Sequence, residues 1–284
     1  MKILVFFLFP LLASAKIEVQ GHRGARAVLP ENTLAAMDYA LAIGVDTLEL
    51  DLAVTKDNIL VLSHDPVLNK TLCRGPKGKK LTKDIVIYNL TSKELQSYNC
   101  AGIKNPRFPK QVADKSQKIP SLREVFDLVK YSKHKAAKKV KFNVETKIVP
   151  NLPEISPKPK AFAQLIVELA KEYKWQSRVI IQSFDYRSLK AAKKIAPHIK
   201  VAALTGEIYP VELVKMLQAI PADIWSPNLK WLNKTMVKKV QNAGMKVIPW
   251  TANTKEEWHA LIDKGVDGII TDDPKELMLF LKRK

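Results

Sequence analysis

Short apolar runs alternate with segments of helical periodicity along the chain from residue 16 onward. Strands that alternate with helices favour parallel pairing, and eight of them close a (β/α)₈ barrel. The pattern therefore predicts an α/β fold, specifically a TIM barrel. An open doubly wound sheet is the alternative, although the chain has neither GxGxxG nor GxxxxGK[ST], the phosphate loops often found with it. The eight candidate strands cover residues 17–21, 47–52, 141–145, 179–182, 200–204, 223–225, 247–250 and 268–270.

Helix boundary signals lie where the barrel needs them. A helix is expected to begin near Thr33 and to end at Gly44. Ser121-x-x-Glu124 and Thr254-x-x-Glu257 are capping boxes, in which a hydroxyl and a carboxylate satisfy free backbone N–H groups. These signals predict helices after the first strand, before the third and before the last.

The N-terminus reads as a secretory signal peptide. Met1-Lys2 precedes the apolar run 3–12, and Ala13-Ser14-Ala15 has the form of a cleavage site. The run is too short to span a bilayer as a helix, and no later segment is apolar enough to do so. We expect a mature chain from about residue 16, without a stable membrane anchor, located in the periplasm or secreted.

Export to an oxidising compartment bears on the state of the two cysteines. Cys73 and Cys100 are the only cysteines of the chain, and an oxidising compartment favours a disulfide between them over two free thiols. Both lie in the interval between the second and third strands, which is far longer than the ~30 residues of a βα unit in a ~250-residue barrel. We interpret the excess, about residues 66–118, as an insertion after the second strand of a single-domain barrel.

The charge balance constrains the partners. The 284 residues include 47 Lys and Arg against 28 Asp and Glu, which gives a formal charge of +19. Such a field favours phosphorylated small molecules, nucleic acid or an anionic surface, without choosing among them. The 46% hydrophobic and 26% charged residues exclude a disordered chain and a polytopic membrane protein.

The second strand carries the first sign of chemistry. Residues 47–52 alternate with period two, so that the leucines face the helices while Glu49 and Asp51 point into the barrel. Two ionised carboxylates ~5 Å apart repel by roughly 3–4 kcal/mol at an effective dielectric constant of about 20. The pair therefore needs a shared proton, a basic partner or a divalent cation.

The third strand repeats the arrangement. Asn143, Glu145 and Lys147 share one face, so that a third carboxylate points inward near the carboxyl end of its strand. Oxygen donors alone suit Mg²⁺ or Ca²⁺ better than zinc. The alternative is that these acids are merely exposed at the strand ends.

Two histidines and two cations lie at strand ends. His22-Arg23 ends the first strand, and His64 follows an apolar stretch just past the second. Histidine is the side chain most readily tuned to transfer protons near neutral pH. Arg23 and Lys147 could hold phosphoryl oxygens. The chain has no G-x-S-x-G, so a serine nucleophile has little support.

Together these motifs resemble the glycerophosphodiester phosphodiesterase family, in the family's order and over nearly the whole mature chain. One departure is Asn58, where the family often has Gly, although Asn also tolerates a positive φ. The disulfide-bearing insertion looks like that of exported bacterial members. The motifs that carry the resemblance are Gly21-His22-Arg23-Gly24, Pro30-Glu31-Asn32-Thr33, Glu49-Leu50-Asp51, Thr55-Lys56-Asp57, His64-Asp65, Ile119-Pro120-Ser121-Leu122, Glu145-Thr146-Lys147, Gln182-Ser183-Phe184 and Trp250-Thr251-Ala252-Asn253.

The resemblance implies a barrel that hydrolyses glycerophosphodiesters to sn-glycerol 3-phosphate and an alcohol, with one divalent cation, Ca²⁺ or Mg²⁺. In this sequence it implies metal ligation by Glu49, Asp51 and Glu145. It further implies an acid and base pair in His22 and His64, phosphate contacts from Arg23 and Lys147, and a pocket lined by Gln182 and Trp250.

Two other functions remain open at this point. One is a phospholipase D-like hydrolysis of lysophospholipids on the same barrel. The other, from a different class, is a non-catalytic binder of anionic envelope polymers. Nucleic acid is not an expected partner, because an exported chain without a nucleic-acid motif has little access to it. The sequence carries no signal for a particular oligomeric state.

Overall fold

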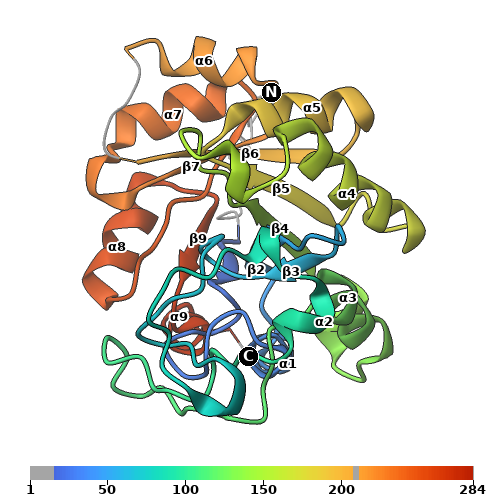
Figure 1. Cartoon of the computed structure of the whole chain (residues 1–284). Helices are drawn as coiled ribbons and strands as arrows, with labels where there is room; N and C mark the ends of the chain where they lie inside the picture. The colour runs from blue at the N-terminus through green and yellow to red at the C-terminus, as the bar shows by residue number, and fades with distance from the viewer. Residues whose placement is uncertain (1–15, 207–210, 284) are drawn as a thin grey trace, which may run out of the picture.

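The computed structural model describes residues 16–206 and 211–283, and the signal peptide predicted for residues 1–15 lies outside them. Eight parallel strands run side by side in the order β8-β7-β6-β5-β4-β2-β1-β9, which confirms the predicted barrel (Figure 1). The strands are β1 (Glu18–Gly21), β2 (Thr47–Val54), β4 (Lys141–Thr146), β5 (Val179–Ser183), β6 (Lys200–Thr205), β7 (Ile224–Pro227), β8 (Lys246–Val247) and β9 (Gly268–Thr271).

The barrel closes between β8 and β9 without a regular ladder. The amide of Asp267 donates to Val247 (2.9 Å), that of Ile270 to Pro249 (3.0 Å) and that of Ala252 to Ile270 (3.1 Å). The apolar run 247–250 yields a strand of only two residues, 246–247. Pro249 has no N–H to donate, so a continued ladder would lack a hydrogen bond there.

Helices cover the outside of the barrel, and three of them begin at the expected caps, Thr33, Ser121 and Thr254. Ser121 and Thr254 form the predicted capping boxes. Gly44 (φ 86°) and Gly265 (φ 80°) end their helices in the left-handed conformation that glycine adopts without strain. The helices are α1 (Leu34–Ile43), α2 (Ser92–Leu95), α3 (Leu122–Tyr131), α4 (Pro159–Glu172), α5 (Tyr186–Ile195), α6 (Leu213–Ala219), α7 (Lys234–Asn242), α8 (Lys255–Lys264) and α9 (Pro274–Phe280).

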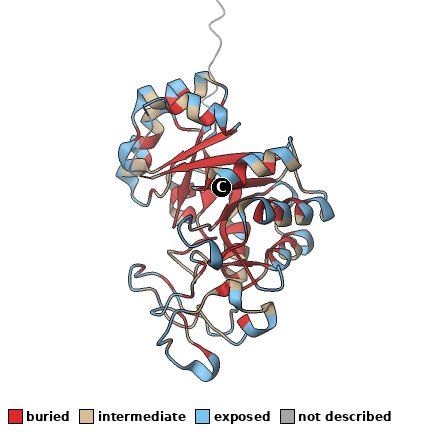
Figure 2. Ribbon diagram, turned by 45° about the horizontal axis from the view of Figure 1, so that its top comes forward, coloured by how far each residue is buried: buried red, intermediate tan, exposed pale blue. Residues whose placement is uncertain are grey.

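The main apolar core lies between the strands and this helical layer. Leu48, Leu50 and Leu52 of β2 are fully buried in it, as the period-two alternation predicts. Figure 2 shows the consequence: the strands are largely buried, and the helices are exposed on their outer faces. The lysines that open β4, β6 and β8 are partly or fully exposed. Among the described residues, no helix combines the length and apolar character needed to cross a bilayer.

The long interval after β2 begins with a hairpin. Strand β3 (Leu60–Leu62) pairs antiparallel with β2, a strand that the sequence analysis treated only as an apolar stretch. Asn58 in the connecting turn has φ 60°. It thus adopts the positive φ that the sequence analysis expected Asn to tolerate at this position. The hairpin directs the chain back over the carboxyl ends of the neighbouring strands.

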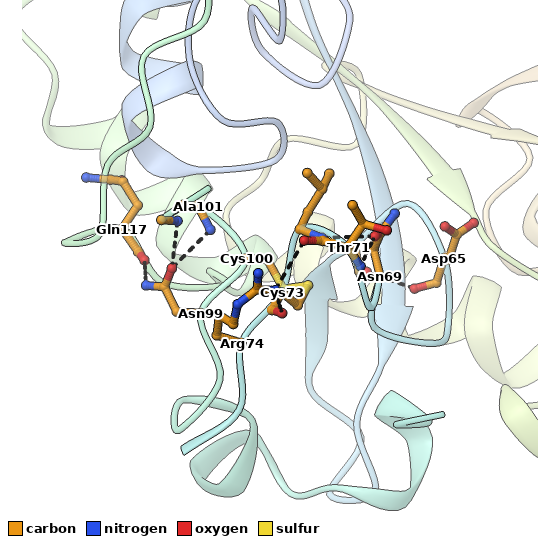
Figure 3. Close-up of a disulfide and its surroundings, with 12 residues drawn as sticks. Asp65, Asn69, Thr71, Cys73, Arg74, Asn99, Cys100, Ala101 and Gln117 are labelled. Carbon is orange, nitrogen blue, oxygen red and sulfur yellow. Dashed lines mark hydrogen bonds between the residues drawn. A yellow bond between two sulfur atoms is a disulfide. The ribbon is translucent and has the colours of Figure 1, made fainter. Parts of the chain in front are cut away.

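The β3–α3 segment, residues 63–121, then forms a lobe beside the barrel (cyan to green in Figure 1). It holds α2 and two short 3₁₀ turns, Pro76–Gly78 and Ile87–Asn89. A small apolar cluster of its own packs against the β2–β3 hairpin, and this cluster includes Cys73. Cys73 is joined to Cys100 by a disulfide, and the flanking residues Arg74 and Asn99 exchange backbone hydrogen bonds of 2.8 and 2.9 Å (Figure 3).

Candidate active site

Three buried carboxylates meet at the carboxyl ends of β2 and β4. Glu49 and Asp51 point inward from β2, and Glu145 points inward from β4, where it is the register partner of Asp51. One oxygen of each carboxylate lies within 4.8 Å of the others. The side chains are only 1–9% exposed, so water screens their repulsion poorly.

This crowding shows in the titration of the three groups. Burial, and next the charge of Asp51, raises the pKa of Glu49 well above its usual range. Burial also raises the pKa of Glu145, against the opposing effect of Lys147. At Asp51 burial acts in the same sense, but Arg23 and Lys147 outweigh it and lower the pKa. Burial thus opposes the ionisation of Glu49 and Glu145, which raises their pKa values, whereas nearby cations favour the ionised form of Asp51 and lower its pKa.

Two cations, the buried Arg23 and the largely enclosed Lys147, balance part of this negative charge. Lys147 Nζ lies 2.8 Å from Glu145 Oε1 and 3.6 Å from Asp51 Oδ1. Arg23 Nε lies 3.1 Å from Asp51 Oδ2, and Arg23 Nη1 lies 2.6 Å from Glu31 Oε1. Asp51 and Glu145 pull the pKa of Lys147 upward against the effect of burial, so it stays charged at neutral pH.

The loop after β1 is shaped to bring Arg23 to this position. A Cβ on Gly21 would lie 2.2 Å from the carbonyl oxygen of Gly24. Gly24 itself has φ 84°, and a Cβ there would lie 2.6 Å from the carbonyl carbon of Ala36 on α1. Only glycine fits both positions. The tight turn directs the backbone N–H of Arg23 at Glu49 Oε2, 2.8 Å away.

Amide side chains fix the orientation of the carboxylates. Gln182 on β5 donates to Glu49 Oε1 (2.7 Å), and Asn32 donates to Asp51 Oδ2 (3.0 Å). Asn143 on β4 in turn donates to Gln182 (2.9 Å). Gln182 thus orients a carboxylate, whereas the sequence analysis assigned it only to the lining of a pocket.

One buried oxygen tests whether a metal ion fits here. Asp51 Oδ1 is buried and accepts no hydrogen bond from the described residues. A buried carboxylate oxygen without a donor is costly unless a cation occupies its lone pairs. The donor set consists only of carboxylate oxygens, which are the ligands that Mg²⁺ and Ca²⁺ prefer. The residues present therefore fit a hard divalent cation held by Glu49, Asp51 and Glu145.

The two predicted histidines occupy different environments. The side chain of His22 is only 12% exposed, with Nδ1 2.6 Å from Asp272 Oδ1 and Nε2 3.9 Å from Glu49 Oε2. Burial, and next the charge of Arg26, lowers the pKa of His22 to about 4 despite the hydrogen bond to Asp272. His64, in the loop after β3, has a side chain that is 36% exposed, and its Nδ1 lies 2.9 Å from Asp65 Oδ1. A fixed neutral imidazole thus lies on one side of the cluster and a more accessible imidazole on the other.

A cavity of about 450 Å³ opens next to the carboxylates, between the mouth of the barrel and the β3–α3 segment. Arg23, Asn32 and His64 line it on the barrel side. The disulfide Cys73–Cys100 lines it on the other side, so these cysteines border the site without reaching the carboxylates. A pocket of this size accepts a ligand larger than one phosphate.

The opposite wall of the mouth is aromatic. Trp250, just after β8, packs against the apolar residues inside the barrel, and its Nε1 donates to Ser226 (3.0 Å). Its ring meets that of Phe184 edge-on, with centroids 5.7 Å apart. Phe184 is 48% exposed, which leaves much of its apolar ring open to solvent. Sequence reasoning singled out Trp250 but gave Phe184 no role.

Sequence reasoning also missed the acid that holds His22. Asp272 is 2% exposed, accepts from Arg26 Nε (2.6 Å) and Asn253 Nδ2 (2.8 Å), and lies beside His22 Nδ1. It follows β9 directly, at the carboxyl end of a barrel strand, where functional groups of this fold gather. That position was the available signal, because Asp272 follows the predicted strand 268–270 by two residues.

Comparisons with known proteins agree with this geometry. The model of the "Glycerophosphoryl diester phosphodiesterase family" matches residues 22–276. A curated glycerophosphodiester phosphodiesterase from Caldanaerobacter subterraneus subsp. tengcongensis is 34% identical over 271 residues, which are 94% of this chain and 99% of that protein.

Solved structures share the fold. A putative glycerophosphoryl diester phosphodiesterase from Silicibacter pomeroyi superposes with a TM-score of 0.86 at 26% identity, covering 94% of each chain. A phosphodiesterase from Oleispira antarctica, solved in complex with its product sn-glycerol-3-phosphate, has a TM-score of 0.76 at 23% identity and covers 93% of this chain and 96% of its own. The chain therefore belongs to the glycerophosphoryl diester phosphodiesterase family and is an enzyme of that class.

Proposed function

We propose that the protein hydrolyses glycerophosphodiesters to sn-glycerol 3-phosphate and an alcohol, with one divalent cation and two histidines. The observation that carries the proposal is the meeting of Glu49, Asp51 and Glu145 beside two cations, Arg23 and Lys147. Family membership supplies the reaction class, and the product complex of the Oleispira protein supports the same kind of substrate here.

The proposed cation is Mg²⁺ or Ca²⁺, held by the three carboxylates. When bound, it would supply positive charge that offsets the negative charge growing on the phosphoryl oxygens. Arg23 and Lys147 add fixed positive charge in a site that is largely closed to water, where each charge acts strongly. Asn32 and Gln182 keep the carboxylates in place, so little reorganisation is needed when the substrate binds.

The histidines divide the proton transfers between them. Asp272 accepts the Nδ1 proton of His22, which leaves His22 Nε2 as the proton acceptor and assigns His22 the role of base. His64 lines the large cavity, where it can protonate the departing alkoxide, so we assign it the role of acid. Two nucleophiles fit: water, or the substrate's own 2-hydroxyl through a cyclic phosphate. A diester that lacks this hydroxyl is turned over only if water attacks directly.

We also propose that the protein acts outside the cytoplasm, in the periplasm or after secretion. The support is the signal-peptide pattern of residues 1–15 together with the Cys73–Cys100 disulfide. The proposal is tested by fractionating cells that express the full chain and sequencing the N-terminus of the mature protein. A product that is found in the cytoplasm with Met1 intact would contradict it.

The function is tested with purified residues 16–284 and glycerophosphocholine, glycerophosphoethanolamine and glycerophosphoglycerol. We expect release of glycerol 3-phosphate that excess EDTA stops and Mg²⁺ or Ca²⁺ restores. His64→Ala should lose at least 10²-fold in kcat because proton donation to the leaving group is lost. Full activity in EDTA would exclude the metal role.

The two other functions give different results in the same assay. Hydrolysis of lysophospholipid in liposomes, without turnover of the soluble diesters, would indicate a phospholipase D-like enzyme. Salt-sensitive binding to anionic polymers without any turnover would indicate a binding protein.

A further inference from the structure

The cavity beside the carboxylates carries an excess of positive charge. Its lining includes the cations Arg23, Arg26, Arg107 and Lys118, against the acids Glu31 and Asp65. The charge is not spread evenly, because the two sides of the cavity differ in how their cations are paired.

On the barrel side the cations are neutralised. Arg23 lies 2.6 Å from Glu31 and 3.1 Å from Asp51. Arg26 lies 2.6 Å from Asp272 Oδ1, and its Nη1 lies 3.9 Å from Glu31. These two guanidinium groups are therefore already engaged by the carboxylates around them.

On the side of the β3–α3 segment the cations are not neutralised. Within the part of the chain that the structure describes, neither Arg107 nor Lys118 has a carboxylate at ion-pair distance. The guanidinium of Arg107 lies over the ring of Phe108, 5.9 Å from its centroid, and Lys118 Nζ donates to the carbonyl of Gln96 (3.2 Å). Both side chains thus keep their charge available to whatever enters the cavity.

The position of the cavity indicates which part of a substrate enters it. His64, the proposed acid, lines this cavity, so the departing alcohol lies on this side of the phosphate. Across the mouth stand the rings of Trp250 and Phe184, whose apolar surfaces offer no charge. About 450 Å³ is enough for an alcohol that carries a further polar group.

We propose that this cavity is a subsite for the alcohol half of the diester, in which Arg107, assisted by Lys118, selects alcohols that carry a negative charge. The proposal deepens the proposed function and rests on it. The preferred substrate class is a glycerophosphodiester whose alcohol bears a second phosphate or a carboxylate. Arg107 would act as a specificity residue, because a guanidinium pairs with such oxyanions in bidentate fashion.

The test compares kcat/KM for three diesters whose alcohol is negative, neutral or positive: glycerophosphoglycerol phosphate, glycerophosphoglycerol and glycerophosphocholine. The enzyme is the mature wild-type chain in saturating Mg²⁺. We expect wild type to prefer the phosphate-bearing diester. In Arg107→Gln, kcat/KM for that diester should fall by about fivefold, the size typical of a partly exposed charge pair. For glycerophosphocholine it should change by less than about twofold.

Two further variants sharpen the result. Arg107→Glu should reverse the preference, since it places a negative charge where the anionic alcohol would lie. Lys83→Gln is the matched control: Lys83 is an exposed cation of the same β3–α3 segment and does not line the cavity. Its substitution removes one charge from the protein and should leave the ratio between substrates unchanged.

The outcomes separate this proposal from the one it rests on. If wild type turns over all three diesters and Arg107→Gln leaves their ratio unchanged, the subsite is wrong while the proposed function stands. Equal effects of Arg107→Gln and Lys83→Gln would also overturn the subsite, since only the long-range field would then matter. If wild type hydrolyses none of the diesters, the proposed function itself is wrong and the subsite falls with it.

Discussion

The inside of the barrel has two unlike halves. The strands β1, β2 and β4 fill their half with polar groups, among them Glu18, Glu49 and Glu145, all buried. The strands from β6 to β9 fill the other half with aliphatic groups such as Ile224 and Ile248, which pack together beneath Trp250. Strand β5 lies on the boundary, because its two inward residues are one aliphatic side chain and one amide.

The difference indicates that one half of the barrel mainly stabilises the fold and the other mainly serves the chemistry. Packing of aliphatic side chains is favourable wherever water is excluded, so the apolar half stabilises the barrel without outside help. Buried carboxylates are costly unless paired, so the polar half depends on Arg23, Lys147 and the proposed divalent cation. Substitutions in the two halves should therefore separate activity from stability.

The largest expected effect is on activity in the polar half. Glu49→Gln removes one of three proposed metal ligands, and kcat/KM should fall on the order of 10³-fold. In EDTA the same variant should unfold no more easily than wild type. The pKa of Glu49 is raised in the folded state. The free energy of unfolding of wild type therefore falls as the pH rises above about 4.3, the pKa of a Glu in the unfolded chain. The variant lacks this loss. Urea denaturation from pH 4 to 8 measures the difference.

Glu18→Gln is the matched control for this prediction. Glu18 also points into the barrel, but Lys141 Nζ lies 2.6 Å away and lowers the pKa of Glu18 against the effect of burial. The ionised form of Glu18 stabilises the fold at pH values above the pKa that this group has in the unfolded chain. This contribution is lost as the pH falls through the lower pKa of the folded state. The control should therefore lose stability at neutral pH and keep its activity. Parallel pH profiles for wild type and Glu49→Gln would contradict the proposed strain at the cluster.

The apolar half should respond in the opposite way. Ile224 is 4% exposed within the inner aliphatic cluster and does not line the substrate cavity. Ile224→Ala should cost about 2–4 kcal/mol in the free energy of unfolding, because it leaves a cavity. We expect kcat/KM to stay within about threefold of wild type, since the substituted side chain lies outside the lining of the substrate cavity. A large loss of activity with unchanged stability would show that the halves are not separable.

The smallest of these effects concerns the acid behind His22. Asp272→Asn removes the charge that fixes the His22 Nδ1 proton and should lower kcat by about 10–100-fold, the range for residues that orient a catalytic or metal-binding group. The Nδ1 proton resonance of His22 should move upfield. The control is Asp273→Asn, which alters a helix-capping residue next to it and should change kcat by less than about twofold. Equal effects of the two substitutions would rule out a positioning role for Asp272.

Much of the barrel followed from the sequence. The strand order could be predicted because alternation of strands and helices leaves few arrangements, and the capping boxes at Ser121 and Thr254 act through residues three positions apart. The inward direction of Glu49, Asp51 and Glu145 was predictable for the same reason, since side chains alternate along a strand. Such local rules do not require knowledge of distant residues.

Other features depended on contacts between distant parts of the chain. Asp272 meets His22 across 250 residues, because β9 lies beside β1 only when the barrel closes. The antiparallel strand β3 was missed because three apolar residues do not distinguish a strand from a loop.

The sequence by itself determined the layers of this protein and which side chains face its axis, because strand and helix periodicities are local properties of the chain. Only the tertiary structure decided which charges find partners. Arg26 is neutralised by an acid 246 residues away, whereas Arg107 is left without one among the described residues. The reason is physical: Coulomb energies depend on distance and burial in space, and spacing along the chain does not report either.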